Sequence, residues 1–167
     1  FGIMKRQCGL ADSVEQLSEE TRQIFSKLLP ERIEMMPGLS SLLEWLESLG
    51  VKKCVATSSH RQFAKTALSF FNLEPRFEFV LTADDVTRGK PDPEVYLTAA
   101  SRLGISVDNL LVLEDSVVGS TAAVNAGAWT IAVPTSHSVG GDFSHVRHVA
   151  TSLEDPIIRQ TLRRPDL

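Results

Sequence analysis

Hydrophobic positions along the chain recur with two different spacings, and these spacings predict helices and strands in turn. In residues 12–29 apolar side chains return every three or four positions, which predicts a helix that Pro30 should stop. A second stripe of this kind covers residues 39–49, after a turn at Pro37 and Gly38. Short apolar runs typical of strands fall within 51–59, 77–85, 109–116, 128–134 and 148–150, and further helices are predicted at about 60–71, 91–104 and 117–126.

Strands and helices alternate from residue 51 onward, and this order indicates the fold class. The later strands are nearly continuous apolar runs, as expected where helices cover both faces of a sheet. Connections of this length favour parallel strands joined by helical crossovers. The pattern therefore predicts an α/β fold with a doubly wound parallel sheet. The first helix precedes the alternation, so residues 1–34 are expected to form an appended helical element and residues 35–167 the α/β core.

Length and charge narrow the functional classes. A chain of 167 residues suits one domain with at most a small appendage, and its formal net charge of −4 comes without a basic patch, so nucleic acid is not an expected partner. No apolar run approaches the roughly 18 residues that span a bilayer, and no signal peptide is recognisable, so no membrane partner is expected. Cys8 and Cys54 lie far apart, which favours a reduced, cytoplasmic setting.

Polar side chains follow the first predicted strand, at the edge where open α/β sheets bind ligands. Thr57, Ser58 and Ser59 can donate hydrogen bonds to phosphate oxygens, aided by the amides of the next helix. The plain alternative is that these hydroxyls cap that helix. His60 and Arg61 come next, and they either reach a phosphate or form a solvated first helical turn.

A lysine and a pair of acids follow the second and third predicted strands. In "RGKPDPEVY" two prolines rigidify the loop around Lys90, which can neutralise a phosphate or a carboxylate; a solvated surface lysine is the alternative. Glu114 and Asp115 end the strand "LLVLEDS". Adjacent carboxylates repel each other, and Mg²⁺, which prefers carboxylate oxygens, would remove the repulsion. A helix N-cap at Asp115 or Ser116 is the alternative, but a cap needs one acid and not two.

The three motifs "VATSS", "GKPDPEVY" and "VLEDS", in this order at successive strand ends, resemble those of the haloacid dehalogenase superfamily. The likeness runs from about Met36 to Pro134. It points to the branch of phosphatases and β-phosphoglucomutases in which a helical cap is inserted early in the chain. The resemblance implies a Rossmann-like core, preceded in residues 1–34 by a remnant of the cap.

The same resemblance implies roles for individual residues. Thr57 matches the family's phosphate-binding Thr/Ser, with Ser58, Ser59 and Arg61 as further phosphate or substrate contacts. Lys90 matches the catalytic lysine that bridges the nucleophile and the phosphoryl group. Glu114 and Asp115 match the acidic motif that holds Mg²⁺.

One motif of the family is missing. Its nucleophile is the first aspartate of a D-x-D motif, at the end of a strand that precedes the cap, and no D-x-D occurs among the 167 residues. Asp12 is the only acid before Glu15, in a stretch too polar for a buried strand. Asp84 and Asp85 follow the wrong strand.

The missing motif also has a structural consequence. In the family fold its strand lies in the middle of the sheet, beside the strand that ends in "LEDS". Without it, buried backbone groups would lack partners, at about 1–3 kcal/mol each. Three arrangements are open: the strand lies in a part of the protein outside these residues, which Phe1 in place of an initiator Met favours; another chain supplies it; or the sheet rearranges.

The expected function is that of a phosphatase that uses Mg²⁺ as its cofactor and hydrolyses a small phosphorylated metabolite. It is incomplete in these residues because the nucleophilic aspartate is missing. A β-phosphoglucomutase-like phosphosugar mutase and a non-catalytic fragment that binds phosphate or Mg²⁺ are the alternatives. Dehalogenase chemistry is less expected, since it needs no Mg²⁺. Lys5 and Arg6 either contact the substrate from the cap or lie on a solvated helix face.

Overall fold

Parallel strands form the centre of the fold, as the alternation of strands and helices predicts. The computed structural model describes residues 11–163, apart from the side chains of residues 22, 26 and 29–32. Every strand pair in this range is parallel, with Val55 opposite Val80, and Leu111 opposite Trp129. The strands are β1 (Val55–Ala56), β2 (Val80–Leu81), β3 (Leu111–Glu114), β4 (Trp129–Ala132) and β5 (His148–Val149).

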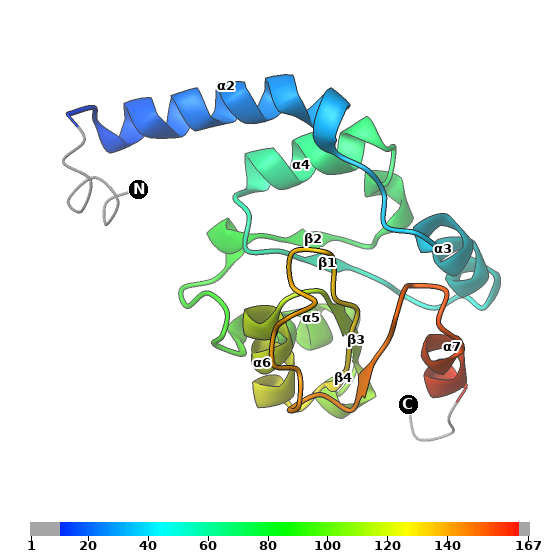
Figure 1. The fold of residues 1–167 in the computed structure, drawn as a ribbon. Helices are drawn as coiled ribbons and strands as arrows, with labels where there is room; N and C mark the ends of the chain where they lie inside the picture. The colour runs from blue at the N-terminus through cyan, green and yellow to red at the C-terminus, as the bar shows by residue number, and fades with distance from the viewer. Residues whose placement is uncertain (1–10, 164–167) are drawn as a thin grey trace.

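Helices connect the strands and surround them (Figure 1). The helices predicted from residue 39 to residue 126 are confirmed, with ends that shift by a few residues. No helix within residues 11–163 has both the length and the apolar character needed to cross a membrane. The α-helices are α2 (Val14–Arg32), α3 (Leu39–Ser48), α4 (Arg61–Phe70), α5 (Glu94–Leu103), α6 (Val117–Ala126) and α7 (Pro156–Leu162), and short 3₁₀ turns lie at η1 (Glu74–Arg76), η2 (Ala83–Asp85) and η3 (Val107–Asn109).

Two helices depart from the sequence prediction. The prediction that Pro30 stops the first helix is wrong: α2 passes Pro30 and ends at Arg32, because a proline lacks its own N–H but leaves the following residues free to extend the last turn. The hydrophobic pattern did not predict α7. Its start carries a recognisable signal, since the side chain of Asp155 accepts a hydrogen bond from the N–H of Ile157 at 3.1 Å and Pro156 occupies the first helical position.

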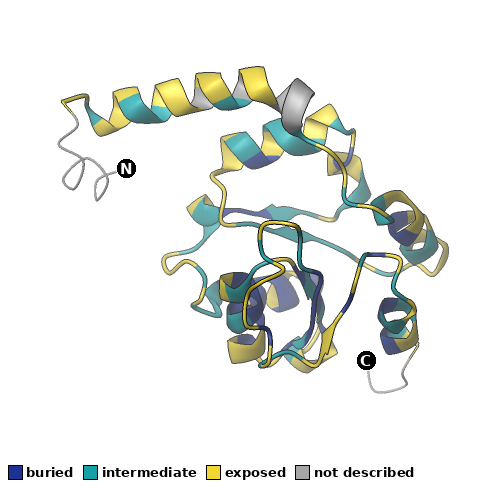
Figure 2. Cartoon of the chain, in the orientation of Figure 1, coloured by how far each residue is buried: buried dark blue, intermediate teal, exposed yellow. Residues whose placement is uncertain are grey.

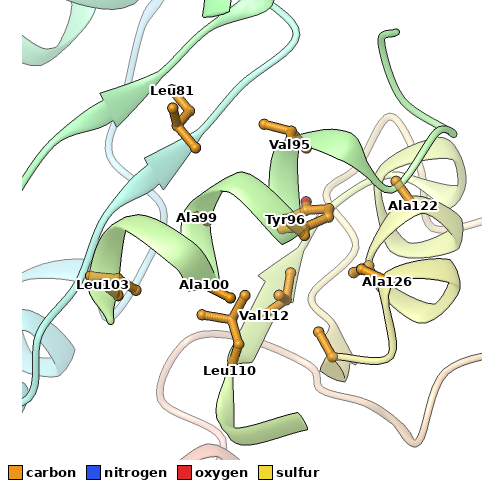
Figure 3. Packing of buried hydrophobic residues seen from close by; sticks show 12 residues of the cluster. Leu81, Val95, Tyr96, Ala99, Ala100, Leu103, Leu110, Val112, Ala122 and Ala126 are labelled. Atoms are coloured by element: carbon orange, nitrogen blue, oxygen red, sulfur yellow. The ribbon is translucent and has the colours of Figure 1, made fainter. Parts of the chain in front are cut away.

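Helices cover both faces of β3 and β4, which accounts for the continuous apolar sequence of these strands. Alternate side chains point to opposite faces of a strand. On one face Val112 joins a cluster with α5 and α6, shown in Figure 3. On the other face Ile131 packs with Leu42 of α3 and Ile158 of α7. The first cluster contains many small side chains that let the helices approach the sheet closely, among them Ala99, Ala100, Ala122, Ala123 and Ala126.

The first helix, α2, lies apart from these layers. It runs along α4, and the ring of Phe25 packs edge-on against the ring of Phe63, with 4.9 Å between the centroids. Much of its remaining surface is exposed, including Ile24 and Leu28 (Figure 2). The contact with α4 therefore accounts for most of what holds the described part of α2 in place.

The strands fall into two separate sheets, β1–β2 and β3–β4–β5. Residues of a strand in a parallel sheet turn their backbone groups alternately to one neighbour and the other. In the first sheet the N–H of Val55 donates to the carbonyl of Phe79, directly before β2, and the N–H of Thr57 donates to the carbonyl of Leu81 in β2. The backbone groups of Cys54 and Ala56 therefore face away from β2, on the side where the second sheet lies (Figure 1).

The second sheet also has an unpaired edge. The carbonyl groups of Leu110 and Glu114 accept hydrogen bonds from the strand segment of β4, so the backbone groups of Leu111 and Leu113 face away from β4. Throughout residues 11–163 no backbone hydrogen bond joins β1 to β3. This is the arrangement expected for a sheet that lacks its middle strand.

We expect hydrogen exchange to reveal the two unpaired edges as an alternation along β1 and β3. The amides of Cys54 and Ala56 should exchange roughly fivefold or more faster than those of Val55 and Thr57, because a hydrogen bond contributes about 1 kcal/mol. Residue-resolved exchange by NMR measures this. Equal protection of all four amides would show that the edge of β1 is already paired.

Candidate functional site

A pocket of about 360 Å³ opens where β1 and β3 end, between the two sheets. It lies at the carboxyl ends of parallel strands, where open α/β sheets bind their ligands. The loops after β1 and β3 and the loop before α5 all contribute to it. Its lining residues are Ala56, Thr57, Ser58, Ser59, Lys90, Glu114, Asp115, Ser116, Val118 and Gly119.

The loop after β1 brings hydroxyl groups to the pocket. The hydroxyl oxygen of Thr57 accepts a hydrogen bond from the N–H of Ser59 at 3.1 Å. This bond folds the loop back on itself and uses the acceptor side of the hydroxyl. The hydroxyl hydrogen of Thr57 has no acceptor among the described residues, so it is available to a bound anion. Ser58 and Ser59 are exposed in the same wall.

The loop before α5 carries Lys90 and is fixed by a carboxylate. Glu94, in the first turn of α5, accepts hydrogen bonds from the N–H of Thr87 at 2.8 Å and from the N–H of Arg88 at 2.9 Å. These bonds hold the pKa of Glu94 below its usual value, and the bond from Thr87 has the largest effect. Asp92 closes the loop by accepting from the N–H of Glu94 at 3.0 Å. Lys90 is thus presented by a loop with little freedom.

Lys90 connects the two sheets. Its ammonium group donates to the carbonyl oxygen of Ala56 at 3.0 Å, at the end of β1, and to Oε1 of Glu114 at 2.5 Å, at the end of β3. Both side chains are almost fully buried, with 8% of Lys90 and 7% of Glu114 exposed. An ammonium group has three N–H donors, and two are used within residues 11–163. The third is left for a ligand.

The carboxylate of Glu114 is held on several sides. Its Oε2 accepts from the hydroxyl of Ser116 at 3.1 Å, and its Oε1 accepts from the hydroxyl of Tyr96 as well as from Lys90. The carboxylate also lies against the first turn of α6. A Cβ at Gly119 would fall 2.1–2.3 Å from the carboxylate atoms, so only glycine leaves room for it there.

Tyr96 enters this network from α5. Its side chain is buried, and the ring centroid lies 5.0 Å from the ammonium nitrogen of Lys90. Burial, and then the negative charge of Glu114, raise the pKa of Tyr96 far above its usual value. The phenol therefore stays protonated and acts as a hydrogen-bond donor.

Asp115 has a different environment from its neighbour Glu114. Its side chain is exposed in the pocket wall and has no hydrogen-bond or ion-pair partner among residues 11–163. The described part of the chain contains no cluster of three or more His, Cys, Asp or Glu side chains that could hold a metal ion. Mg²⁺ commonly binds through one or two carboxylates, completed by water and substrate phosphate. Of the two acids in the described lining, Asp115 is the one whose carboxylate is open to such an ion, because Lys90, Tyr96 and Ser116 hold Glu114.

Comparison with known proteins identifies the family of this site. Residues 3–133 match the protein family described as Haloacid dehalogenase-like hydrolase, which is more than half of the chain. The chain belongs to this family. The resemblance drawn from the three strand-end motifs is therefore confirmed, including the branch that contains phosphatases and β-phosphoglucomutases.

Two curated relatives are similar over much of this chain. Phosphorylated carbohydrates phosphatase of Thermotoga maritima is 36% identical over 129 residues, which are 75% of this chain and 58% of that protein. Validoxylamine A 7'-phosphate phosphatase of Streptomyces hygroscopicus subsp. limoneus is 39% identical over 100 residues, 60% of this chain and 47% of that protein. The chain thus spans about half of the length of these relatives.

A solved structure shows the same fold. The crystal structure of CbbY from Rhodobacter sphaeroides in complex with phosphate matches with a TM-score of 0.80 at 23% identity. The match covers 86% of this haloacid dehalogenase-like hydrolase and 66% of the CbbY chain. The predicted Rossmann-like α/β fold is confirmed.

Of the site residues predicted from the sequence, the structure brings all but Arg61 to one pocket. The guanidinium of Arg61 pairs with Asp85 at 2.6 Å, and the backbone N–H of Arg61 donates to the carboxylate of Asp84 at 2.8 Å. The hydrogen bond from this N–H is the largest cause that holds the pKa of Asp84 below its usual value, and the hydrogen bond with the His60 ring at 2.6 Å comes second. The two acids after β2 thus bind the start of α4 and draw Arg61 and His60 away from the pocket lining. Lys5 and Arg6 lie outside the described residues.

The alternative explanation of "LEDS", a helix N-cap, accounts for one residue of the motif. Ser116 is the N-cap of α6, because its hydroxyl oxygen accepts from the N–H of Gly119 at 3.0 Å. Neither Glu114 nor Asp115 caps the helix. The sequence motifs did not identify Tyr96 and Gly119 as parts of the site. Tyr96 is the last residue of "GKPDPEVY", and Gly119 stands three residues after "VLEDS".

We predict that Gly119→Ala destabilises the fold of this chain. Replacing glycine by alanine inside a helix usually stabilises it by roughly 0.5–1 kcal/mol. Here the new methyl group would overlap the Glu114 carboxylate, and overpacking of this kind costs about 1–3 kcal/mol in the free energy of unfolding. Urea unfolding measures the difference.

Gly89→Ala is the matched control for that variant. No atom lies within 4 Å of a Cβ built at Gly89, and Gly89 is not among the glycines with positive φ. Its free energy of unfolding should stay within about 0.5 kcal/mol of the original chain. If Gly119→Ala were as stable as Gly89→Ala, the carboxylate of Glu114 would not lie against α6.

Proposed function

We propose that this chain forms the core of a Mg²⁺-dependent phosphatase that acts on a small phosphorylated metabolite. The observation that carries the proposal is the convergence of a free hydroxyl, a buried lysine and an unpaired carboxylate in one pocket, from Thr57, Lys90 and Asp115. Membership of the haloacid dehalogenase-like hydrolases supports a hydrolytic reaction. Curated relatives named as phosphatases support the phosphate ester as the bond that is cleaved.

The charges of the pocket support a requirement for a divalent cation. Lys90 is the only basic lining residue and Glu114 already neutralises it, so Asp115 leaves the described lining with one net negative charge. A phosphate dianion would be repelled by that charge at short distance. Mg²⁺ on Asp115, beside the engaged carboxylate of Glu114, would reverse the sign of the local charge and neutralise phosphate oxygens.

The remaining polar groups suit the binding of a phosphoryl group. The hydroxyl hydrogen of Thr57 and the third N–H of Lys90 would donate to phosphate oxygens in the pocket. Ser58 and Ser59 add hydroxyl donors on the Thr57 side. The guanidinium of Arg61 is not part of this phosphate site, because Asp85 binds it.

The acid that attacks phosphorus is proposed to come with a strand that fills the space between β1 and β3. Both strands present unpaired edges, and the carbonyl of Ala56 is bonded to Lys90 in place of a strand. A strand parallel to β1 and β3 would end at the pocket, within reach of Lys90. The strand lies outside the 167 residues, in the rest of the protein or in another chain, because no D-x-D motif occurs among them.

The substrate class is proposed from the relatives. One is named for phosphorylated carbohydrates and another for validoxylamine A 7'-phosphate. A small phosphorylated carbohydrate therefore represents the class to test first. The setting we propose is the cytoplasm, since Cys54 is a free thiol.

A second function, binding of phosphate and Mg²⁺ without hydrolysis, is favoured by one specific observation. Of the two acids in the described lining, Glu114 is fully engaged by Lys90, Tyr96 and Ser116. Asp115 would be occupied by the metal ion. No carboxylate in this part of the chain is then left to act as a nucleophile. A phosphosugar mutase would need the same nucleophile, and no pocket residue favours it over the phosphatase.

Binding and hydrolysis together test the proposal. Mg²⁺ is expected to bind the chain, and Asp115→Asn should weaken its affinity roughly tenfold, equal to about 1.4 kcal/mol. Isothermal titration with MgCl₂ measures this. The matched control is Asp108→Asn, an exposed acid in η3 that undergoes the same charge change away from the pocket. Equal Mg²⁺ affinity of Asp115→Asn and the original chain would contradict the metal site.

Hydrolysis of p-nitrophenyl phosphate separates the two functions. Mg²⁺-dependent turnover that EDTA abolishes supports the phosphatase, in a protein that includes a D-x-D strand. Binding of Mg²⁺ and phosphate without turnover, even with that strand present, would support the non-catalytic function. Turnover that survives the double change Glu114→Ala and Asp115→Ala would refute the assignment of the site.

A further inference from the structure

A buried phenol outside the pocket lining shares a hydrogen-bond acceptor with the lysine inside it. The hydroxyl of Tyr96 donates to the same oxygen of Glu114, Oε1, that receives the ammonium of Lys90. The pocket lining includes Lys90 and Glu114 but not Tyr96. Tyr96 can therefore affect a ligand only through these two residues.

The contacts around Oε1 leave Glu114 with one well-defined position. Its other oxygen is held by Ser116, and Gly119 provides the space that the carboxylate fills. The phenol is rigid, because the ring of Tyr96 belongs to the packed cluster of α5, α6 and β3 (Figure 3). A hydrogen bond from a rigid, buried donor thus fixes the acceptor that in turn fixes Lys90.

We infer that Tyr96 is a positioning residue for Lys90. It holds Glu114 so that two N–H groups of Lys90 point to Glu114 and Ala56 and the third points to the anion site. The inference rests on the proposed function, because the anion site is the phosphate site proposed above. Without the phenol oxygen, Glu114 would keep its pairing with Lys90 but lose the donor that orients Oε1.

The test compares Tyr96→Phe with Thr130→Val in the full chain. Each variant removes one buried hydroxyl and keeps the size of the side chain; Thr130 is 1% exposed, and its hydroxyl donates to the carbonyl of Ala128 at 3.2 Å, away from the pocket lining. Both variants lose stability, so a change seen only in Tyr96→Phe reports on the site. Loss of the Tyr96 hydrogen bond should change the measured quantities roughly fivefold, which corresponds to about 1 kcal/mol.

The first measurement is the rate at which an amine-acylating reagent modifies Lys90, followed by peptide mass spectrometry. Lys53 serves as the internal reference, because it is also mostly buried, at 15% exposed, and paired with an acid, Glu47, at 3.3 Å. Tyr96→Phe should raise the Lys90 rate relative to Lys53 by roughly fivefold, and Thr130→Val should leave the ratio unchanged. An unchanged ratio in Tyr96→Phe would overturn the inference.

The second measurement is the affinity for inorganic phosphate in the presence of Mg²⁺, by isothermal titration. Tyr96→Phe should weaken it roughly fivefold, while Thr130→Val keeps the original affinity. Faster modification of Lys90 with unchanged phosphate affinity would make Tyr96 a structural residue only and overturn its positioning role. If the original chain binds no phosphate, the proposed function fails, and the modification rates alone still decide whether Tyr96 holds Lys90.

Discussion

The buried ion pair between Lys90 and Glu114 is the interaction on which the rest of the structure depends. The two sheets share no backbone hydrogen bond within residues 11–163, and this pair, extended to the carbonyl of Ala56, joins the end of β1 to the end of β3. Breaking a buried pair by removing one partner costs about 3–5 kcal/mol, a large part of the stability of a domain. The position of the pocket walls relative to each other therefore rests on this contact together with the apolar cluster that contains Leu81 of β2 and Val112 of β3.

The two acids of "LEDS" have different surroundings because successive side chains along a strand point to opposite sides. Glu114 turns inward, where Lys90, Tyr96 and Ser116 surround it, and Asp115 turns outward into the pocket. Glu114 thus helps to hold the fold together, and Asp115 remains open to a ligand. Only one of the two adjacent carboxylates therefore lacks a partner among residues 11–163.

Much of the fold was predictable, because hydrophobic spacing reports directly on which faces are buried. The strand ends were the most informative positions: Thr57, Lys90 and Asp115 come from three separate segments, and the parallel topology alone brings them together. Partners that depend on side-chain direction were not predictable. The pairs of Arg61 with Asp85 and of Tyr96 with Glu114 join residues 24 and 18 positions apart, and no local pattern marks them. The passage of α2 through Pro30 was missed because a proline near the end of a helix breaks few of its bonds.

Because the sheet is divided between β1 and β3, the proposed strand would complete both the fold and the active site. A strand that enters between β1 and β3 gains backbone hydrogen bonds along both of its sides, and its last residue arrives at the mouth of the pocket. Completion of the sheet and completion of the catalytic centre are then a single cooperative event. Under the proposed arrangement, a molecule in which that strand has not yet entered would keep the pocket around Thr57, Lys90 and Asp115 but would lack the acid that attacks phosphorus.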